Sequence, residues 1–280
     1  MAKAKSNINV ELCGKGRGQL NVVGIGPGQK DWRTPAVARA IMDSSHIVGY
    51  RLYLDLISDL VKHKICFTSE LSKEVDRARK ALDLAGEGKT VALVSSGDAG
   101  IYALATLVFE LIDKENQPKW NRIKIKIEPG ISAVQAAAAR AGAPLGNDFC
   151  AISLSDLLTP WEQIERRLRA AVDGDFIIAV YNPASKRRQE HLERAKEIFL
   201  SKRSKKTPVV LARNLGREGE SLKIIDLAKL SSHMVDMLTI IIVGNSQTCS
   251  VNFGEYFKIY TPRGYSSKFK TVNKAKVQLN

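Results

Sequence analysis

The feature that most constrains the fold is a succession of strand, turn and helix that begins at Gln19 and repeats along the chain. Short segments rich in β-branched residues, such as LNVV (residues 20–23) and TVALV (residues 90–94), alternate with longer segments of helical spacing. Parallel strands need crossover connections, and these are usually helices. The alternation therefore predicts an α/β protein whose first part holds a mostly parallel sheet of five strands.

The helical segments fall into two groups. In the first part, helices are expected over residues 35–44, 71–85, 101–114 and 132–141, and a further one is expected to end before Lys62. In the second part, helices are expected over residues 161–172 and 189–200, and the strand fraction is higher. SLKII (residues 221–225) closely follows a turn, so we expect it to pair antiparallel with the strand before that turn.

The chain length indicates two domains. A chain of 280 residues reaches the size at which hydrophobic cores tend to split. AGAPLGND (residues 141–148) concentrates turn residues and predicts a hinge there. We expect a basic N-terminal extension over residues 1–18, an α/β domain over residues 19–142, a second α/β domain over residues 143–262 and a basic C-terminal tail over residues 263–280.

The net charge of +14 is concentrated at the two ends of the chain. Residues 1–18 carry +3 and residues 263–280 carry +5, which leaves +6 for the rest. Lysines in low-complexity ends are typical of solvated tails. Few aromatic residues that could stack on bases lie among them: residues 1–18 hold none, and residues 263–280 hold only Tyr265 and Phe269. We therefore expect no nucleic-acid partner.

Other classes of protein are also disfavoured. The longest stretches of mainly apolar residues, Phe176–Tyr181 and Leu238–Val243, are far shorter than the roughly 20 residues that span a bilayer. The first residues lack the apolar region of a secretory signal, so we expect a cytoplasmic protein with no membrane association. The cysteines and histidines are scattered without ligand spacing, which predicts neither a metal site nor a disulfide framework.

A glycine-rich turn, GIGPG (residues 24–28), directly follows the first strand. Such turns bind the pyrophosphate of dinucleotides when their spacing is G-x-G-x-x-G. Here Gln29 stands where the last glycine is required, and Pro27 removes an N–H donor. A dinucleotide-binding oxidoreductase is therefore poorly supported, and a tight turn without a ligand remains an alternative.

Two further turns end strands in the first part. In SSGDAGIY (residues 95–102), Asp98 offers either a carboxylate to a ligand or an N-cap to the helix that follows. In EPGISA (residues 128–133), Ser132 is placed as an N-cap. Ligands of open α/β sheets bind outside the carboxyl ends of the strands, so three such turns together indicate a binding site.

Arginines occur in the strand-end loops of the second part. Arg213 and Arg217 lie in RNLGREGE (residues 213–220), and Arg263 lies in TPRGY (residues 261–265). Guanidinium groups match carboxylates bidentately, so these three are candidate ligands for a polycarboxylate substrate. Solvated surface arginines are the alternative interpretation.

The motifs as a set resemble the tetrapyrrole methyltransferases of cobalamin biosynthesis. The likeness covers about residues 19–265 and rests on an ordered series: GIGPG followed by Thr34-Pro35, VALVSSGDAGIY, PGISA, ISLSDLLTPWEQIERRL, YNPASKRR, RNLGREGE, MLTIIIVGNSQT and TPRGY. Within that family, the likeness is nearest to members that methylate C17 of precorrin-3B or cobalt-factor III with contraction of the ring.

The resemblance implies two α/β domains of the tetrapyrrole methyltransferase type, not the Rossmann type, with S-adenosylmethionine in the cleft between them and a homodimer as the assembly. The residues that it assigns to the cofactor are Pro27, Ser96, Gly97, Asp98, Ile101, Ser132, Ala133, Tyr181, Asn182, Leu215, Thr239 and Ile240. Asp98, Tyr102 and Asp148 are the candidates for acid–base chemistry, and the tetrapyrrole is the expected substrate. Methylation at another ring carbon and a non-catalytic tetrapyrrole- or cofactor-binding module remain alternatives.

The chain departs from the family pattern at three places. Ala99 follows Gly97-Asp98 where many relatives have proline, which leaves the carboxylate in place. Gln29 and Lys30 follow GIGPG where many relatives have an acid. Asn147 stands where a histidine is expected before Asp148, and an asparagine cannot replace a proton-transfer group.

Overall fold

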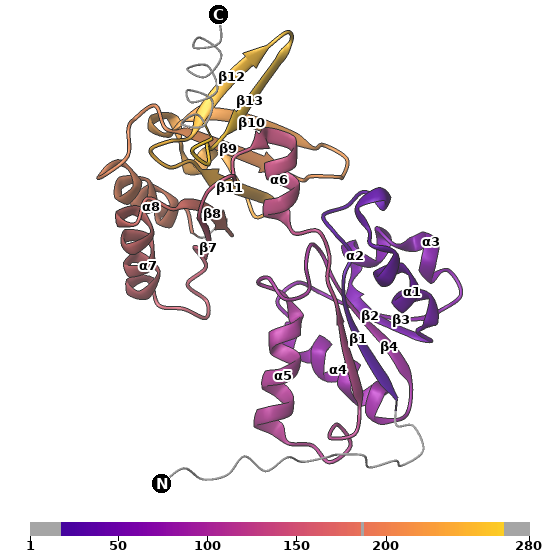
Figure 1. Cartoon of the computed structure of the whole chain (residues 1–280). Coiled ribbons are helices and arrows are strands. Elements are labelled where there is room, and N and C mark those ends of the chain that lie inside the picture. The colour runs from indigo at the N-terminus through magenta and orange to yellow at the C-terminus, as the bar shows by residue number, and fades with distance from the viewer. Residues whose placement is uncertain (1–17, 186–187, 266–280) are drawn as a thin grey trace, which may run out of the picture. The chain divides into compact units, whose positions relative to one another are not determined.

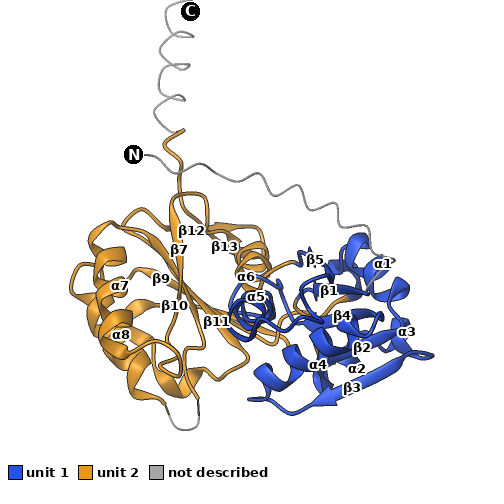
Figure 2. Cartoon of the chain, turned by 90° about the horizontal axis from the view of Figure 1, so that it is seen from below, with its two compact units in different colours: residues 1–26, 30–130 blue, residues 27–29, 131–280 orange. Residues whose placement is uncertain are grey.

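The computed structural model describes residues 18–185 and 188–265, which form two units (Figures 1 and 2). The first unit comprises residues up to Gly26 together with Lys30–Gly130, and the second comprises Pro27–Gln29 and the residues from Ile131 onward. The expected N-terminal extension and C-terminal tail lie almost entirely outside the described residues.

The sheet of the first unit has the five strands that the sequence predicts, and it is parallel throughout rather than mostly parallel. Its strand order is β3-β2-β4-β1-β5. The strands are β1 (Gln19–Gly24), β2 (His46–Tyr50), β3 (Ile65–Ser69), β4 (Thr90–Ser95) and β5 (Lys124–Glu128). The helices are η1 (Lys30–Trp32), α1 (Pro35–Asp43), α2 (Arg51–Asp55), α3 (Ser58–Val61), α4 (Glu74–Gly86) and α5 (Leu104–Glu115).

Helices cover both faces of this sheet because its central strands are apolar on both sides. On β1, Leu20 and Val22 pack with α4 and α5, whereas Val23 packs with α1, α2 and the residues around them. Residues of β4 divide between the same two cores. Each large apolar side chain buried in this way stabilises the fold by about 1.5–3 kcal/mol.

Two helices begin later than the sequence predicts. α4 starts at Glu74 rather than at residue 71, and α5 starts at Leu104 rather than at residue 101. The backbone is left-handed just before each start, with φ of 70° at Ser72 and 51° at Tyr102. A helix cannot continue through a left-handed residue, so the segment before α5 forms a loop.

The second unit holds a mixed sheet in the order β10-β9-β11-β8-β7. Its strands are β7 (Phe149–Ser153), β8 (Ile177–Tyr181), β9 (Pro208–Arg213), β10 (Ser221–Asp226) and β11 (Thr239–Val243). β7 and β8 are parallel, and the other pairs are antiparallel, which confirms the antiparallel pairing expected for residues 221–225. The short helices η2 (Leu227–Lys229) and η3 (Ser232–Met234) connect β10 to β11.

Three longer helices accompany this sheet. α7 (Trp161–Asp173) and α8 (Glu190–Leu200) pack on one face, where Leu168, Phe199 and Ile241 are buried in a common core. α6 (Ala133–Ala141) packs against β9, β10 and β11. Because α6 contacts these strands, the units divide after Gly130, earlier than the boundary expected after residue 142.

A small third sheet in the second unit was not expected from the sequence. It joins β12 (Cys249–Phe253), β13 (Tyr256–Tyr260) and β6 (Gly142–Ala143) in the order β12-β13-β6. The prediction of a hinge at residues 141–148 is therefore wrong at its start, where α6 ends and β6 is paired with β13. Gly142 makes this pairing possible, because a Cβ there would overlap the carbonyl oxygen of Ile259.

Candidate functional site

The three strand-end turns of the first unit lie at one edge of its sheet. β4, β1 and β5 are neighbours and run in the same direction. Gly24 pairs with Ser95, and Val23 pairs with Glu128, so the carboxyl ends of these strands are level. The expectation that the turns at residues 24–28, 95–102 and 128–133 share an edge is confirmed at the strand ends.

The backbones of these turns approach one another closely. Gly26 and Gly97 exchange two hydrogen bonds, at 3.1 and 2.8 Å, with both residues at positive φ. A Cβ on Gly130 would overlap the carbonyl oxygens of Gly24 and Gly97. Only glycine allows this approach, so backbone N–H and carbonyl groups, rather than side chains, line the edge.

Asp98 braces this edge. Its Oδ1 accepts the N–H of Gly100 at 2.8 Å, and its Oδ2 accepts the N–H of Gly130 at 3.0 Å. The alternative role as the N-cap of α5 is wrong, because the N-cap position is Ala103 and no side chain caps the helix. Asp98 therefore ties the turn after β4 to the turn after β5.

The loop between Ser95 and α5 has three properties of a ligand site. The Ser95 Oγ is buried and has no hydrogen-bond partner within the described part of the chain. Ile101 and Tyr102, later in the same loop, are 40% and 54% exposed, and Tyr102 has a strained left-handed backbone. Strain of this kind gathers where a chain binds ligands. Ser96 and Gly97 are half-buried in the same loop.

The second unit has a corresponding edge. β7, β8 and β9 end there, and β11 begins there, because β11 runs antiparallel to β8 and β9. Thr239 pairs with Arg213, and the Nδ2 of Asn182 donates to the Ser153 Oγ at 3.0 Å. The strand ends that carry the expected cofactor residues of this unit are thus brought together: Tyr181, Asn182, Leu215, Thr239 and Ile240.

The N-terminus of α6 joins the same edge. Ser132 and Gln135 form a reciprocal capping box, which confirms the predicted N-cap. One residue into the helix, the N–H of Val134 donates to the Tyr181 Oη at 3.4 Å. Ser132 and Ala133 therefore lie close to Tyr181.

Pro27 and two of the arginines also belong to this edge. The Nε of Arg217 donates to the carbonyl oxygen of Pro27 at 2.6 Å. The Nε of Arg213 donates to the Asp236 Oδ2 at 2.8 Å. Burial raises the pKa of Asp236, but hydrogen bonds from Arg213, Thr239 and Leu238 outweigh burial and hold that pKa below its usual range.

Asp148 and Arg263 lie elsewhere. The carbonyl oxygen of Asp148 accepts from Ile177 at the start of β8, whereas Tyr181 is at the other end of that strand. Arg263 follows Thr261, whose Oγ1 is 2.8 Å from the Oγ1 of Thr248, beyond the carboxyl end of β11. Both are therefore at the opposite edge of the sheet, and we withdraw the expected catalytic role of Asp148 and the substrate role of Arg263.

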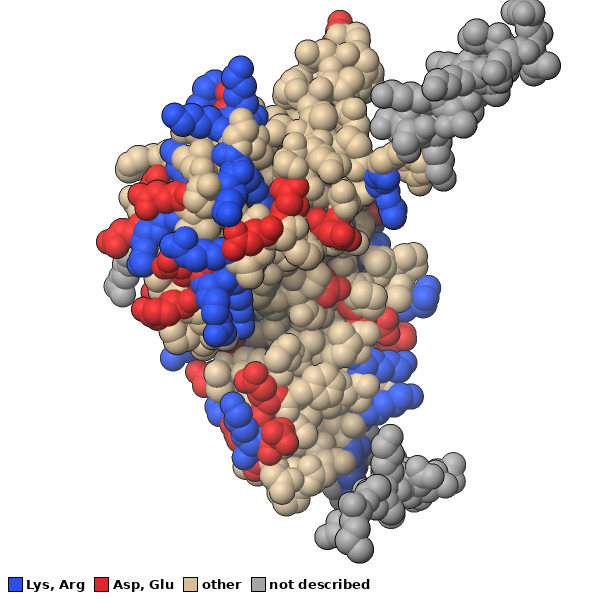
Figure 3. All heavy atoms as spheres, turned by 60° about the vertical axis from the view of Figure 1, so that its left-hand side comes forward, with Lys and Arg blue, Asp and Glu red and all other residues tan. Residues whose placement is uncertain are grey.

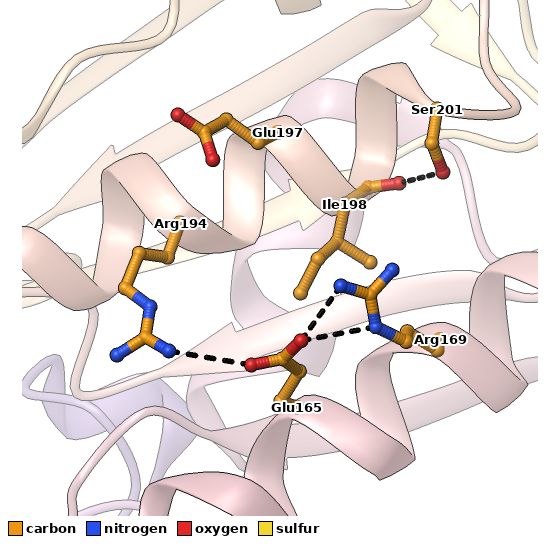
Figure 4. A pocket seen from close by; sticks show the side chains of 6 residues that line it. All are labelled: Glu165, Arg169, Arg194, Glu197, Ile198 and Ser201. Atoms are coloured by element: carbon orange, nitrogen blue, oxygen red, sulfur yellow. Dashed lines mark hydrogen bonds and ion pairs between the residues drawn. The ribbon is translucent and has the colours of Figure 1, made fainter.

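A surface groove of about 290 Å³ between α7 and α8 is no candidate site (Figure 4). Arg169 and Arg194 both pair with Glu165 there, at 2.6 and 3.3 Å. Hydrogen bonds from Arg169 and Trp161 hold the pKa of Glu165 below its usual range. Glu165 is thus shared by two arginines on the helix surface, away from the strand ends.

Ser95 is a site residue that the sequence does not single out, and its only signal is its place in a strand-end motif.

In the described residues, no cluster of His, Cys, Asp and Glu could hold a metal ion. No helix within the ranges that the structure covers is long and apolar enough to cross a membrane. Basic and acidic side chains are interspersed on the face drawn in Figure 3.

Comparison with known proteins places the chain in a family. The tetrapyrrole (corrin/porphyrin) methylases match residues 19–231. The chain belongs to this family. It is 43% identical to the precorrin-3B C(17)-methyltransferase of Sinorhizobium sp over 250 residues. The matched region covers 89% of this chain and 98% of that relative.

Another relative is longer than this chain. The cobalt-factor III methyltransferase of Priestia megaterium is 41% identical over 263 residues, which make up 94% of this chain but 48% of that protein. The chain thus spans about half the length of this curated relative.

Solved structures share the fold. The methyltransferase CobJ has a TM-score of 0.80 and 40% identity, with 88% of this chain and 100% of that chain covered. A uroporphyrin-III C-methyltransferase from Thermus thermophilus, solved in complex with S-adenosyl homocysteine, has a TM-score of 0.60, covers 81% of this chain and 92% of its own, and is 16% identical. The two-domain α/β architecture expected from the resemblance is therefore confirmed as that of this family.

Proposed function

We propose that the chain is an S-adenosylmethionine-dependent methyltransferase of cobalamin biosynthesis that methylates C17 of precorrin-3B or cobalt-factor III and takes part in contraction of the ring. The observation that carries the proposal is the assembly of family motifs into two polar strand-end edges, one in each unit. The names of the relatives that match most of this chain support the choice of C17.

The residues of the first unit fit such a cofactor. The cofactor has amino, carboxylate and ribose hydroxyl groups, which need backbone and hydroxyl partners. The glycine turns expose backbone polar groups, and the buried Ser95 Oγ has no partner among the residues described. The exposed Ile101 offers an apolar contact. Ser96, Gly97 and Asp98 complete this group.

The second unit contributes residues of a different character. Leu215, Thr239 and Ile240 are buried at the strand ends, and Tyr181 and Asn182 are half-buried beside them. Asn182 has a left-handed backbone with φ of 51°. We assign this edge, together with Pro27, Ser132 and Ala133, to cofactor binding on the basis of the family resemblance.

Methyl transfer does not require the protein to form a covalent bond with either reactant. The bound cofactor supplies an electrophilic methyl group, and the tetrapyrrole supplies a nucleophilic ring carbon. The protein has to hold the reacting atoms in line and exclude water. The strand-end edge of the first unit can orient the cofactor, because Asp98 accepts hydrogen bonds from two of its turns and fixes them relative to each other.

Substrate binding requires positive charge, because a tetrapyrrole of this class carries several carboxylates. Arg213 is the best-placed candidate, since its side chain is 42% exposed at the edge that carries Thr239. Of the acid–base candidates, Tyr102 and Asp98 remain. We further propose that the protein acts in the cytoplasm as a homodimer, for which light scattering of the purified protein is the test.

Two measurements test the proposed function. Calorimetry with S-adenosylhomocysteine should show one site per protomer. Incubation with S-adenosylmethionine labelled in its methyl group and with cobalt-factor III or precorrin-3B should move the label to the tetrapyrrole. Binding of both compounds without transfer would instead favour the non-catalytic binding module, and no binding of either would overturn the proposal.

A further inference from the structure

The first glycine turn is divided between the two units. Gly24 and Gly26 contact the turn after β4 in the first unit. The next three residues, Pro27–Gln29, belong to the second unit. Nothing in the sequence pattern of GIGPGQ indicates this division, so the contacts that hold Pro27–Gln29 need an explanation.

Two glycines bring the backbones together. A Cβ on Gly28 would overlap the carbonyl oxygen of Gly216. A Cβ on Gly216 would lie 2.7 Å from the backbone nitrogen of Gln29, and Gly216 has φ of +70°. The absence of a Cβ on each glycine therefore allows the two backbones to touch. The turn after β9 is in direct contact with Pro27–Gln29.

Three charged side chains form hydrogen bonds around the contact between Gly28 and Gly216. Arg217 donates to the Pro27 carbonyl oxygen at 2.6 Å. Glu220 accepts the N–H of Gly216 at 2.7 Å through Oε2 and the Nε of Arg140 at 2.9 Å through Oε1. Arg140 in turn donates to the Gln29 Oε1 at 3.2 Å.

Arg217 binds Pro27 at one end of the segment and Arg140 binds Gln29 at the other, so both ends are held. Hydrogen bonds that involve charged groups are the stronger class, and removal of one partner leaves the other unsatisfied. Gln29 suits this arrangement because its amide oxygen accepts from Arg140, which already pairs with the Glu220 carboxylate.

We propose that Arg217, Glu220 and Arg140 are positioning residues that set the conformation of Pro27–Gln29 for cofactor binding. The proposal rests on the proposed function, because it takes Pro27 as a cofactor contact. It also changes the expected role of Arg217. Its Nε donates to the backbone carbonyl of Pro27, so its replacement should weaken cofactor binding rather than tetrapyrrole binding.

The sharpest test compares two glycines with the same kind of backbone. Gly216 and Gly254 both have positive φ, but a Cβ on Gly254 has nothing within 4 Å. Gly216→Ala and Gly254→Ala therefore carry similar backbone strain, and only the first disturbs Gln29. We expect calorimetry with S-adenosylhomocysteine to show at least about tenfold weaker binding for Gly216→Ala and an unchanged dissociation constant for Gly254→Ala.

The side chains are tested in the same assay. Arg217→Ala should weaken S-adenosylhomocysteine binding about tenfold, and Arg217→Lys should restore part of it, because lysine can still donate to one carbonyl oxygen. Arg169→Ala, which breaks a surface ion pair on α7, is the matched control and should bind as the wild type does. In turnover, the KM for S-adenosylmethionine should rise while the KM for the tetrapyrrole stays within about twofold.

Hydrogen exchange gives a readout that does not depend on activity. The amides of Gly28 and Gln29 should exchange faster in Arg217→Ala than in Arg169→Ala. Equal cofactor binding by the wild type, Gly216→Ala and Arg217→Ala would overturn the inference while leaving the proposed function intact. A rise in the tetrapyrrole KM alone would also overturn it, and a wild type that binds no S-adenosylhomocysteine would overturn both.

Discussion

The carboxylate of Asp98 accepts the backbone N–H of Gly130 at 3.0 Å, from a turn 32 residues further along the chain. Its other oxygen accepts the N–H of Gly100 within its own turn. One side chain thus fixes the relative position of the turns after β4 and β5, at the edge that we propose binds the cofactor.

Replacement of Asp98 should therefore weaken cofactor binding. Asp98→Ala leaves two N–H groups without their acceptor, and we expect a loss of about 1–3 kcal/mol in the binding free energy of S-adenosylhomocysteine. Asp98→Asn keeps one oxygen acceptor and should lie between the wild type and the alanine variant. Calorimetry measures the effect, and circular dichroism checks the fold. Unchanged affinity in a folded Asp98→Ala protein would remove Asp98 from the site.

Arg213 provides a test of substrate binding. Arg213→Ala should raise the KM for the tetrapyrrole about tenfold, which corresponds to about 1.4 kcal/mol, without changing cofactor affinity. Arg213→Lys should recover only part, because lysine lacks the bidentate fork. The assay belongs at low ionic strength, where screening is weakest. If neither variant changes the KM there, Arg213 only pairs with Asp236.

Glu193 predicts a specific dependence of stability on pH. Its Oε1 accepts the Ser232 N–H at 2.7 Å, and this hydrogen bond holds the pKa of Glu193 below its ordinary value. The interaction therefore stabilises the fold fully above the unfolded-state pKa of about 4.3 and is lost as the pH falls through the lower folded-state value.

Denaturant unfolding at a series of pH values measures this effect. Below about pH 4.5, the free energy of unfolding of the wild type should fall more steeply than that of Glu193→Gln. Glu197→Gln, an exposed position on the same helix, is the control and should follow the wild type. Parallel curves for the wild type and Glu193→Gln would contradict the assignment.

The sequence predicts the parallel sheet and the strand-end turns because their signals are local. LNVV and TVALV are buried strands, and glycines follow both of them. The β12–β13 hairpin was missed, although CSVNF in β12 alternates apolar and polar residues as a strand does. All five residues of β12 are exposed, so this strand does not form part of a buried core.

The roles of single site residues depend on contacts that sequence spacing does not carry. Arg217 and Pro27 are 190 residues apart, so no periodicity links the arginine to the first turn. Asp148 was misplaced for a related reason. Its motif lies near the start of β7, and only the direction of that strand shows that Asp148 is at the edge away from Tyr181.

The position of the transferred methyl group tests the central claim most directly. The full chain is incubated with cobalt-factor III or precorrin-3B and with S-adenosylmethionine that carries ¹³C in its methyl group, and the product is analysed by NMR. The account predicts one labelled methyl carbon, attached to C17 of a contracted ring. A label at any other ring carbon, or a tetrapyrrole recovered without label, would contradict it.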